Sequence, residues 1–194
     1  MMRIITGSAR GTKLVSLEGE ATRPTSERAK EALFSMLAFE ISGREVLDLF
    51  SGSGQLALEA LSRGADRATL VDSAPAAIRV IRQNVEKTHM SQKAEVVQSD
   101  CMTFLKRADA AKQYDLIFID PPYAKRLVPD ILNTILMRGL ASEHAIFVCE
   151  SEENDIFEGN DELRAHFEIR KVQHYAKAVV TILDMKNNKA GETE

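Results

Sequence analysis

The feature that most restricts the fold of this chain is an alternation, from Glu45 onward, between short apolar runs and longer segments with helical spacing. The apolar runs read EVLDLF, RATLVD, AEVVQSD, DLIFID and AIFVCE, and segments such as AAIRVIRQNVEK lie between them. Strands that alternate with helices of roughly 10 to 15 residues form right-handed βαβ units around a parallel sheet. The pattern therefore predicts an α/β fold with a Rossmann-like, mostly parallel sheet covered by helices on both faces.

The two ends of the chain depart from this alternation. Near the C-terminus, HFEIRKVQHY and KAVVTILD are joined by too few residues for a crossover helix, so we expect an antiparallel pair there and seven strands in all. At the N-terminus, MRIITGSARGTKLVSL is typical of a β-hairpin around a glycine-containing turn. A helix capped by Thr25 or Ser26 should follow, because apolar residues then recur with helical spacing.

Length and composition limit the number of domains. At 194 residues, of which 44% are apolar and 28% charged, the chain has room for one well-packed domain. We predict a single domain over residues 1–185, with a hairpin extension at 1–24 and a Rossmann-like core at 25–185, followed by a disordered polar tail at 186–194. No window suits a membrane span and the N-terminus lacks the apolar segment of a signal peptide, so we expect a cytoplasmic protein.

Neither the cysteines nor the histidines are spaced for metal binding. Cys101 and Cys149 form no CxxC motif or Cys/His cluster, fit a reducing compartment, and are expected in or near the core. The four histidines are scattered along the chain and are expected at the surface or on strands. The sequence therefore predicts no metal site.

A glycine loop follows the first strand of the alternating region. Gly52 and Gly54 stand between DLF and a helical segment, where glycine allows a sharp turn and the free N–H groups of the helix face a ligand. With Ala57 they satisfy G-x-G-x-x-G/A, and Asp72 stands at the tip of the second strand. By itself this pattern points to a nicotinamide dinucleotide.

Acidic side chains at successive strand ends favour a different nucleoside. Asp48, inside the first strand, places a negative charge beside the ligand, which suits the sulfonium and ammonium groups of S-adenosylmethionine better than a pyrophosphate. Asp72 can accept from the ribose hydroxyls, although it can also cap the helix that follows it, and Asp100 can bind the adenine. The residues expected to contact this cofactor are Asp48, Phe50, Ser51, Gly52, Gly54, Asp72, Ser73, Asp100 and Cys101.

The fourth strand ends in the segment DPPY, residues 120–123. Proline restricts the residue before it and has no N–H to donate, so this loop is rigid and rich in acceptors. The Asp120 carboxylate and the Pro121 carbonyl can hold the two hydrogens of an amino group on a planar ring, while Pro122 stiffens the loop and Tyr123 offers a face for stacking. The alternative is a purely structural role, in which DPPY is a tight turn before a helix that starts near Lys125.

This arrangement suits methyl transfer to an exocyclic nucleobase amine. Such a nitrogen is a poor nucleophile because its lone pair is delocalised into the ring, and the acceptors in DPPY can release that lone pair for in-line attack on the sulfonium methyl group. Asp120 also stabilises the positive charge that develops on nitrogen. The target nucleotide must be unstacked or flipped to reach the loop. In a doubly wound sheet the first and fourth strands are neighbours, so Gly52 and Asp120 should face one crevice.

The motifs DLFSGSG, EALSRGA and DPPY, together with RPTSERAKEALF and RIITGSARGTKL, resemble the RsmD family of bacterial 16S ribosomal RNA guanine-N2 methyltransferases. The resemblance covers roughly Arg3 to Asp184. It implies a class I methyltransferase fold, S-adenosylmethionine as donor, and one guanine of 16S rRNA as acceptor, within the small subunit or an assembly intermediate, with the enzyme acting as a monomer. The sequence departs from the family pattern at Ala176, where glycine is expected.

The N-terminal segment is the expected RNA-binding region. Residues 1–30 hold six basic against three acidic side chains, whereas the whole chain has a net charge of −4. By the resemblance, Pro24 and its neighbours line the entrance near the target base, although Arg28 is equally suited to a surface ion pair. The expected RNA-binding residues are Arg3, Arg10, Lys13, Arg23, Thr25 and Arg28.

Other functions remain open at this point. An NAD-dependent oxidoreductase shares the glycine pattern but lacks a Tyr-x-x-x-Lys or His/Arg arrangement. A pyrimidine C5 methyltransferase needs a cysteine nucleophile, and neither cysteine is placed for attack. Adenine-N6 and protein glutamine methyltransferases use closely similar loops, the latter usually with asparagine at the position of Asp120. A role in RNA binding or ribosome assembly without catalysis would leave the crevice unexplained.

Overall fold

The computed structural model describes residues 2–17, 24–122, 127–175 and 178–186, the side chains of 24–28 excepted. Its helices are α1 (Pro24–Met36), α2 (Gln55–Ser62), α3 (Pro75–Lys87), α4 (Cys101–Arg107), α5 (Val128–Arg138) and α6 (Asp161–Ala165). Its strands are β1 (Glu45–Asp48), β2 (Arg67–Asp72), β3 (Ala94–Gln98), β4 (Tyr114–Ile119), β5 (Ala141–Ser151), β6 (Phe167–Tyr175) and β7 (Ala178–Met185). Within these ranges no helix is long and apolar enough to cross a membrane.

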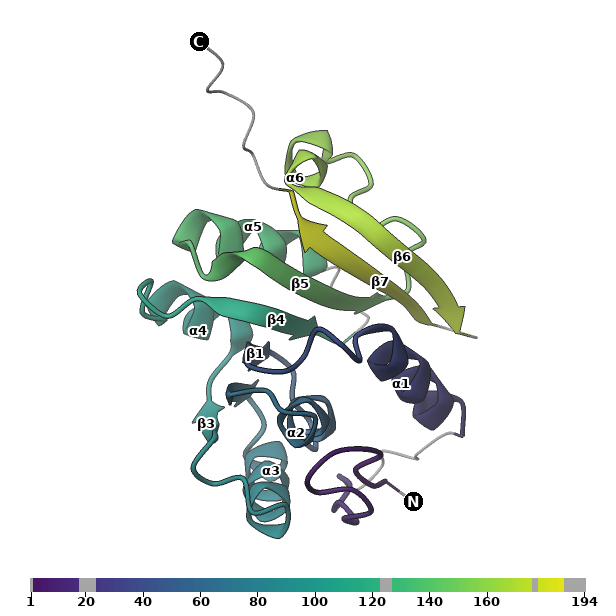
Figure 1. Cartoon of the computed structure of the whole chain (residues 1–194). Helices are drawn as coiled ribbons and strands as arrows, with labels where there is room; N and C mark the ends of the chain where they lie inside the picture. Colours follow the sequence, from purple (N-terminus) through teal and green to yellow (C-terminus); the bar gives the residue numbers. More distant parts are fainter. Residues whose placement is uncertain (1, 18–23, 123–126, 176–177, 187–194) are drawn as a thin grey trace.

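The strands form one seven-stranded sheet in the order β3-β2-β1-β4-β5-β7-β6 (Figure 1). The pairs from β3 to β5 are parallel, and β7 is antiparallel to both β5 and β6. This arrangement confirms the predicted α/β class, the antiparallel C-terminal pair and the adjacency of the first and fourth strands. The chain order reverses between β1 and β4, which is the position where ligands bind in sheets of this kind.

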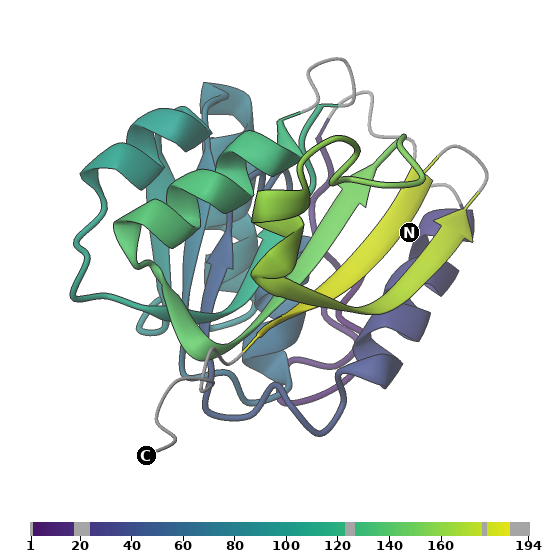
Figure 2. The same cartoon turned by 90° about the horizontal axis from the view of Figure 1, so that it is seen from above.

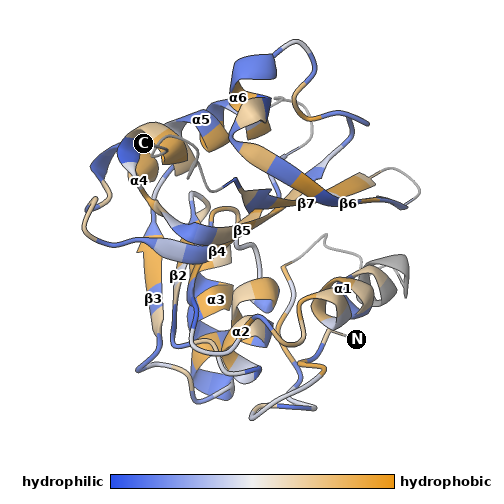
Figure 3. Ribbon diagram, turned by 45° about the horizontal axis from the view of Figure 1, so that its top comes forward, coloured by the Kyte–Doolittle hydropathy of each residue, from blue (hydrophilic) through white to orange (hydrophobic). Residues whose placement is uncertain are grey.

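Helices cover both faces of the sheet, and each face has its own apolar core. Residues of α1, α2 and α3 bury one cluster, and residues of α4, α5 and α6 bury the other. Figure 2 shows α4 and α5 on the opposite side of the sheet from α1. Hydrophobic and hydrophilic colours alternate along α2 and α3 in Figure 3, as expected of helices with one buried side.

Several local expectations need correction. Helix α1 begins at Pro24, ahead of Thr25 and Ser26, because proline is well suited to the first helical position. Helix α5 begins at Val128, not near Lys125. The N-terminal hairpin is present as a single antiparallel bridge between Arg3 and Lys13 and forms no regular strand pair within the described residues. Residues 187–194 of the tail predicted at 186–194, and the turn at Ala176, lie outside the described residues.

The hairpin is fastened to α2 and α3 through buried polar side chains. The Glu59 carboxylate accepts from the backbone N–H groups of Ile5 (2.7 Å) and Thr6 (3.1 Å). Asn84 exchanges two hydrogen bonds with the backbone of Val15, at 2.7 and 2.9 Å, and donates a third to the Ser53 carbonyl at 2.8 Å. The N-terminal segment is therefore bonded to the helices that flank the glycine loop.

Candidate functional site

Three acidic residues meet at the carboxyl edge of the parallel strands. In the sheet register Asp48 lies beside Leu70 of β2 and beside Phe118 of β4. Asp72 and Asp120 therefore stand two residues beyond the level of Asp48, on the strands that flank β1. The structure brings together at one edge the acids that the sequence predicted there.

The glycine loop is held between these acids by backbone hydrogen bonds. The Ser51 N–H donates to the Val71 carbonyl at 3.0 Å, and the Gly54 N–H donates to the Ser51 carbonyl at 2.6 Å. Gly54 has φ 78° and precedes α2. A Cβ on Gly54 would lie 3.0 Å from Leu70 Cδ2 and 3.5 Å from Leu58 Cδ1, so glycine is needed for both its conformation and its packing.

Asp72 connects the glycine loop to the second strand. Its Oδ2 accepts from the Gly52 N–H at 2.9 Å, and its Oδ1 accepts from the Ala74 N–H at 2.8 Å. The N-cap of α3 is Ala74, so the expectation that Asp72 caps this helix is wrong. Asp72 instead closes a turn just before the helix. A carboxylate has about four acceptor positions, so Asp72, which is half-buried, keeps capacity for hydroxyl groups. Ser73 is exposed next to it.

The end of β3 places Asp100 at the start of α4. Asp100 is the N-cap of that helix and accepts from the Thr103 N–H at 3.0 Å, yet its side chain is exposed. The next residue, Cys101, is buried, and burial raises the pKa of its thiol to about 12. Cys149 is buried as well, and burial raises its pKa too. Neither cysteine provides a thiolate nucleophile, as the sequence predicted.

Asp48 is the most unusual group at this edge. It is 2% exposed, and its Oδ2 has no hydrogen-bond partner among the described residues. Burial raises the pKa of Asp48 to about 7; Asp72 adds to the rise, whereas the Ala57 N–H, Ser51 and Lys30 lower it. An unsatisfied buried carboxylate oxygen costs free energy unless a donor reaches it. The arrangement fits a cationic ligand group.

The DPPY segment lies at the same edge, after β4. Asp120 is exposed, so its side chain is not turned into the interior, while Pro121 is buried and Pro122 is exposed. Tyr123 lies outside the described residues. The rigid acceptor loop expected from the sequence is thus described as far as its second proline.

The other expected residues are placed only in part. Phe50 is half-buried against the core cluster of α4 and α5, and the Ser51 hydroxyl is buried and donates to the Asp48 carbonyl at 2.8 Å. Arg3, Arg10 and Lys13 are placed on the hairpin, and all three are exposed. The remaining RNA-binding candidates, Arg23, Thr25 and Arg28, lie outside the described side chains.

The sequence reasoning missed two residues beside this site. Lys30 of α1 donates from Nζ to Oε1 of Gln55, the first residue of α2, at 2.5 Å. Gln55 is buried directly behind the glycine loop. The only sequence signal for this contact was that Gln55 directly follows GSG. The separation of Lys30 and Gln55 along the chain gives no indication that their side chains meet.

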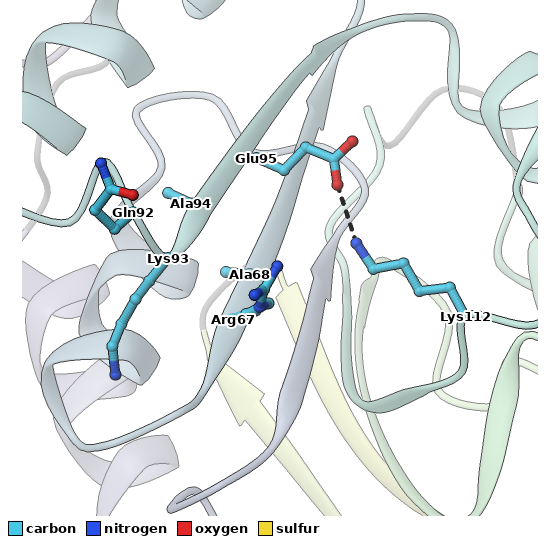
Figure 4. A pocket seen from close by; sticks show the side chains of 7 residues that line it. All are labelled: Arg67, Ala68, Gln92, Lys93, Ala94, Glu95 and Lys112. Atoms are coloured by element: carbon cyan, nitrogen blue, oxygen red, sulfur yellow. Dashed lines mark hydrogen bonds and ion pairs between the residues drawn. The ribbon is translucent and has the colours of Figure 1, made fainter.

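A cavity of about 100 Å³ lies elsewhere, at the amino ends of β2 and β3 (Figure 4). Within it Lys112 points toward Glu95 and bonds its Oε2 at 3.0 Å, whereas Lys93 points away from both. The basic side chains that line this cavity do not point toward a common position. The cavity lies at the opposite edge of the sheet from Asp48 and Asp120. It is not part of the candidate site. Among the described residues no group of three histidine, cysteine or acidic side chains is placed to hold a metal.

The chain is similar to known proteins over most of its length. The model of a family described as Conserved hypothetical protein 95 matches residues 2–184. The chain is 38% identical over 151 residues to Ribosomal RNA small subunit methyltransferase D of Escherichia coli K12, covering 78% of this chain and 75% of that protein. It is 34% identical over 154 residues to the protein of the same name from Haemophilus influenzae, covering 79% and 80%.

Solved structures resemble the whole fold. The Escherichia coli protein yhhF superposes with a TM-score of 0.82 at 31% identity, covering 95% of this chain and 98% of that chain. A hypothetical protein of Thermus thermophilus gives a TM-score of 0.74 at 29% identity, covering 94% and 98%. The likeness therefore extends over both layers of helices and the complete sheet.

Proposed function

Because this chain belongs to the family Conserved hypothetical protein 95, the RsmD family of ribosomal RNA methyltransferases, we propose that it methylates the exocyclic N2 amine of a guanine in 16S rRNA. Its methyl donor is S-adenosylmethionine. The enzyme acts in the cytoplasm, as a monomer, on the small subunit or an assembly intermediate. The observation that carries the proposal is the sheet register that gathers Asp48, Asp72 and Asp120 at one edge.

The residues at that edge fit S-adenosylmethionine. The unsatisfied Oδ2 of Asp48 accepts from the ammonium group, and the spare acceptor positions of Asp72 take the ribose hydroxyls. Asp100 accepts from the adenine amine, and the loop at Gly52 and Gly54 lets the backbone approach without a Cβ. When bound, the cofactor supplies an electrophilic methyl group on a sulfonium.

The acceptor loop prepares the nucleophile. The Asp120 carboxylate and the Pro121 carbonyl would accept from the two hydrogens of the guanine N2 amine, so that the nitrogen lone pair is freed from the ring for attack on a methyl group. As the N–C bond forms, the S–C bond of the donor would break with its electron pair left on sulfur. Positive charge would develop on the nitrogen, and the carboxylate of Asp120 would stabilise it. The nitrogen then loses one proton, which Asp120 can accept. Tyr123 stacks on the extruded base.

The hairpin contributes contacts to the RNA backbone. Its bases Arg3, Arg10 and Lys13, with Arg23, Thr25 and Arg28 of the RPTSERAKEALF segment, bind phosphates on either side of the target nucleotide. Such contacts position the RNA and make its affinity fall as salt increases. An acidic protein needs them concentrated in one region.

The test is incubation with radiolabelled S-adenosylmethionine and small ribosomal subunits that lack the modification, followed by nucleoside analysis. We expect the label in N2-methylguanosine. Label in N6-methyladenosine or in protein would overturn the substrate assignment, because closely similar loops serve those reactions. A parallel titration with NAD is expected to give no binding, and binding of NAD in place of S-adenosylmethionine would contradict the cofactor assignment.

A further inference from the structure

Lys30 joins helix α1 to the floor of the cofactor site. Its Nζ donates to Gln55 Oε1 at 2.5 Å, and Gln55, 5% exposed, opens the helix that follows the glycine loop. The charge of Lys30 also acts on Asp48, which lies on β1 behind the same loop. One half-buried cation on α1 is thus hydrogen-bonded to the first residue of α2, and its charge favours the ionised form of the buried acid.

The other groups that act on Asp48 are acidic or uncharged. From β2 it faces the carboxylate of Asp72, which opposes its ionisation, and from the loop it faces the Ser51 hydroxyl and the Ala57 N–H. Glu59, one turn further along α2, is occupied by the N-terminal backbone and by Arg63. Among the described groups that act on Asp48, Lys30 is the one cation.

We propose that Lys30 is a positioning residue of the cofactor site: its bond to Gln55 holds its positive charge beside the glycine loop, where that charge favours the ionised form of Asp48 to which an ammonium group binds. This inference rests on the proposed use of S-adenosylmethionine. It assigns to the RPTSERAKEALF segment a second role, in cofactor affinity, besides the proposed contacts of that segment with RNA.

The role predicts a specific dependence on pH. A ligand with an ammonium group binds the ionised form of Asp48, so its affinity falls as the pH drops through the pKa of that group. Without the charge of Lys30 the pKa of Asp48 rises further, because a nearby cation favours the carboxylate. In Lys30→Met the pH at which the affinity falls therefore moves upward, and the affinity at pH 7 drops about twofold.

The experiment measures the Kd of two ligands by calorimetry from pH 6 to 8.5. One ligand is S-adenosylhomocysteine, which carries the ammonium group, and the other is 5′-methylthioadenosine, which lacks it. We expect Lys30→Met to shift the profile of the first ligand and not that of the second, and Lys30→Arg to restore the wild-type profile. Lys106→Met, at an exposed position on the opposite face of the sheet, is the control and leaves both profiles unchanged. The ligand's own amino group titrates equally in all variants, so it cancels in the difference.

The outcomes separate the inference from the proposed function. If wild-type protein binds both ligands and Lys30→Met leaves the pH profile unmoved, the role of Lys30 is wrong while the cofactor assignment stands. Equal weakening of both ligands at every pH would mean that the variant damages the loop, and would also overturn the inference. If the wild-type protein binds neither ligand, the cofactor assignment itself fails.

Discussion

Asp48 illustrates how a single residue can lower the stability of the fold at the place where we propose that a ligand binds. Its folded-state pKa of about 7 lies above the ordinary aspartate value of 3.8 because burial disfavours the charge. A raised carboxyl pKa contributes stability that is fully present below the unfolded value and is lost as pH rises through the folded value. The ligand-free protein therefore carries a destabilised carboxylate at neutral and alkaline pH.

Asp48→Asn tests this cost. The amide has the same shape and no charge, so we expect the variant to gain stability relative to wild type by on the order of 2 kcal/mol between pH 5.5 and pH 8. The same variant is expected to lose affinity for S-adenosylhomocysteine. Urea unfolding at the two pH values measures the first effect and calorimetry the second. A stability difference that does not change with pH would contradict the raised pKa.

Gly54 carries a second prediction at the scale of one residue. Gly54→Ala places a Cβ at positive φ and within 3.0 Å of Leu70 Cδ2, in the core. Gly139→Ala is a matched control, since Gly139 also has positive φ (63°) but nothing lies within 4 Å of its Cβ position. We expect Gly139→Ala to cost about 1 kcal/mol of unfolding free energy and Gly54→Ala to cost more, because only Gly54 adds a clash. Chemical denaturation of both variants decides the matter, and equal losses would mean that Leu70 yields without cost.

At the scale of elements, the N-terminal segment depends on buried groups in α2 and α3. Glu59, 1% exposed, accepts from two backbone N–H groups and from the Nε–H of Arg63. The Cζ of Arg63 lies 4.9 Å from the centre of the Phe34 ring. One carboxylate thus bonds the hairpin and Arg63, whose side chain packs on α1. Neither contact could be inferred from the helical pattern, which only marked a glutamate on a helix.

Glu59→Ala is expected to release the hairpin. It leaves two N–H groups and the partly buried Arg63 without their acceptor, a loss on the order of 2 to 4 kcal/mol. In this variant, amide hydrogen exchange should become faster at Ile5 and Thr6 while the amides of β4 stay protected. Glu86→Ala, at an exposed position of α3, serves as the comparison and should leave those amides protected. Unchanged protection in Glu59→Ala would show that the hairpin is held by its apolar contacts alone.

At the scale of the whole molecule, the site exists because separate strands end at one edge. Asp120 and Asp48 are far apart in the sequence and are brought together only by the parallel pairing of β1 and β4. Each acid can therefore be removed independently of the other. Binding of the cofactor and activation of the amine should be separable by mutation.

Asp120→Ala tests this separation. Asp120 is exposed and lies beyond the end of β4, so we expect the variant to fold. We expect methyl transfer to fall by at least about 100-fold, because one electrostatic contact to the developing charge is removed. Affinity for S-adenosylhomocysteine should stay within a factor of about two of the wild-type value. Labelled methyl transfer and calorimetry on the same preparation give both quantities, and an unchanged rate would remove Asp120 from the mechanism.

The sequence by itself determined the class of fold and the acids of the candidate site. Alternation of apolar runs with helical segments is a local property, and it predicted all seven strands and the antiparallel end of the sheet correctly. The strand-terminal residues Asp48, Asp72 and Asp120 could be recognised because parallel strands present their carboxyl ends at a common edge. Local signals sufficed for these features since each depends on neighbouring residues in the chain.

Only the tertiary structure decided which side chains support that edge. The bond from Lys30 to Gln55, the attachment of the hairpin by Glu59 and Asn84, and the position of Asp72 in a turn ahead of the Ala74 cap all join residues whose contact follows from packing. Burial likewise raised the pKa of Asp48, and burial cannot be assigned before the layers are assembled. Such contacts leave no periodic trace in the sequence, because they arise where helices and strands meet in three dimensions.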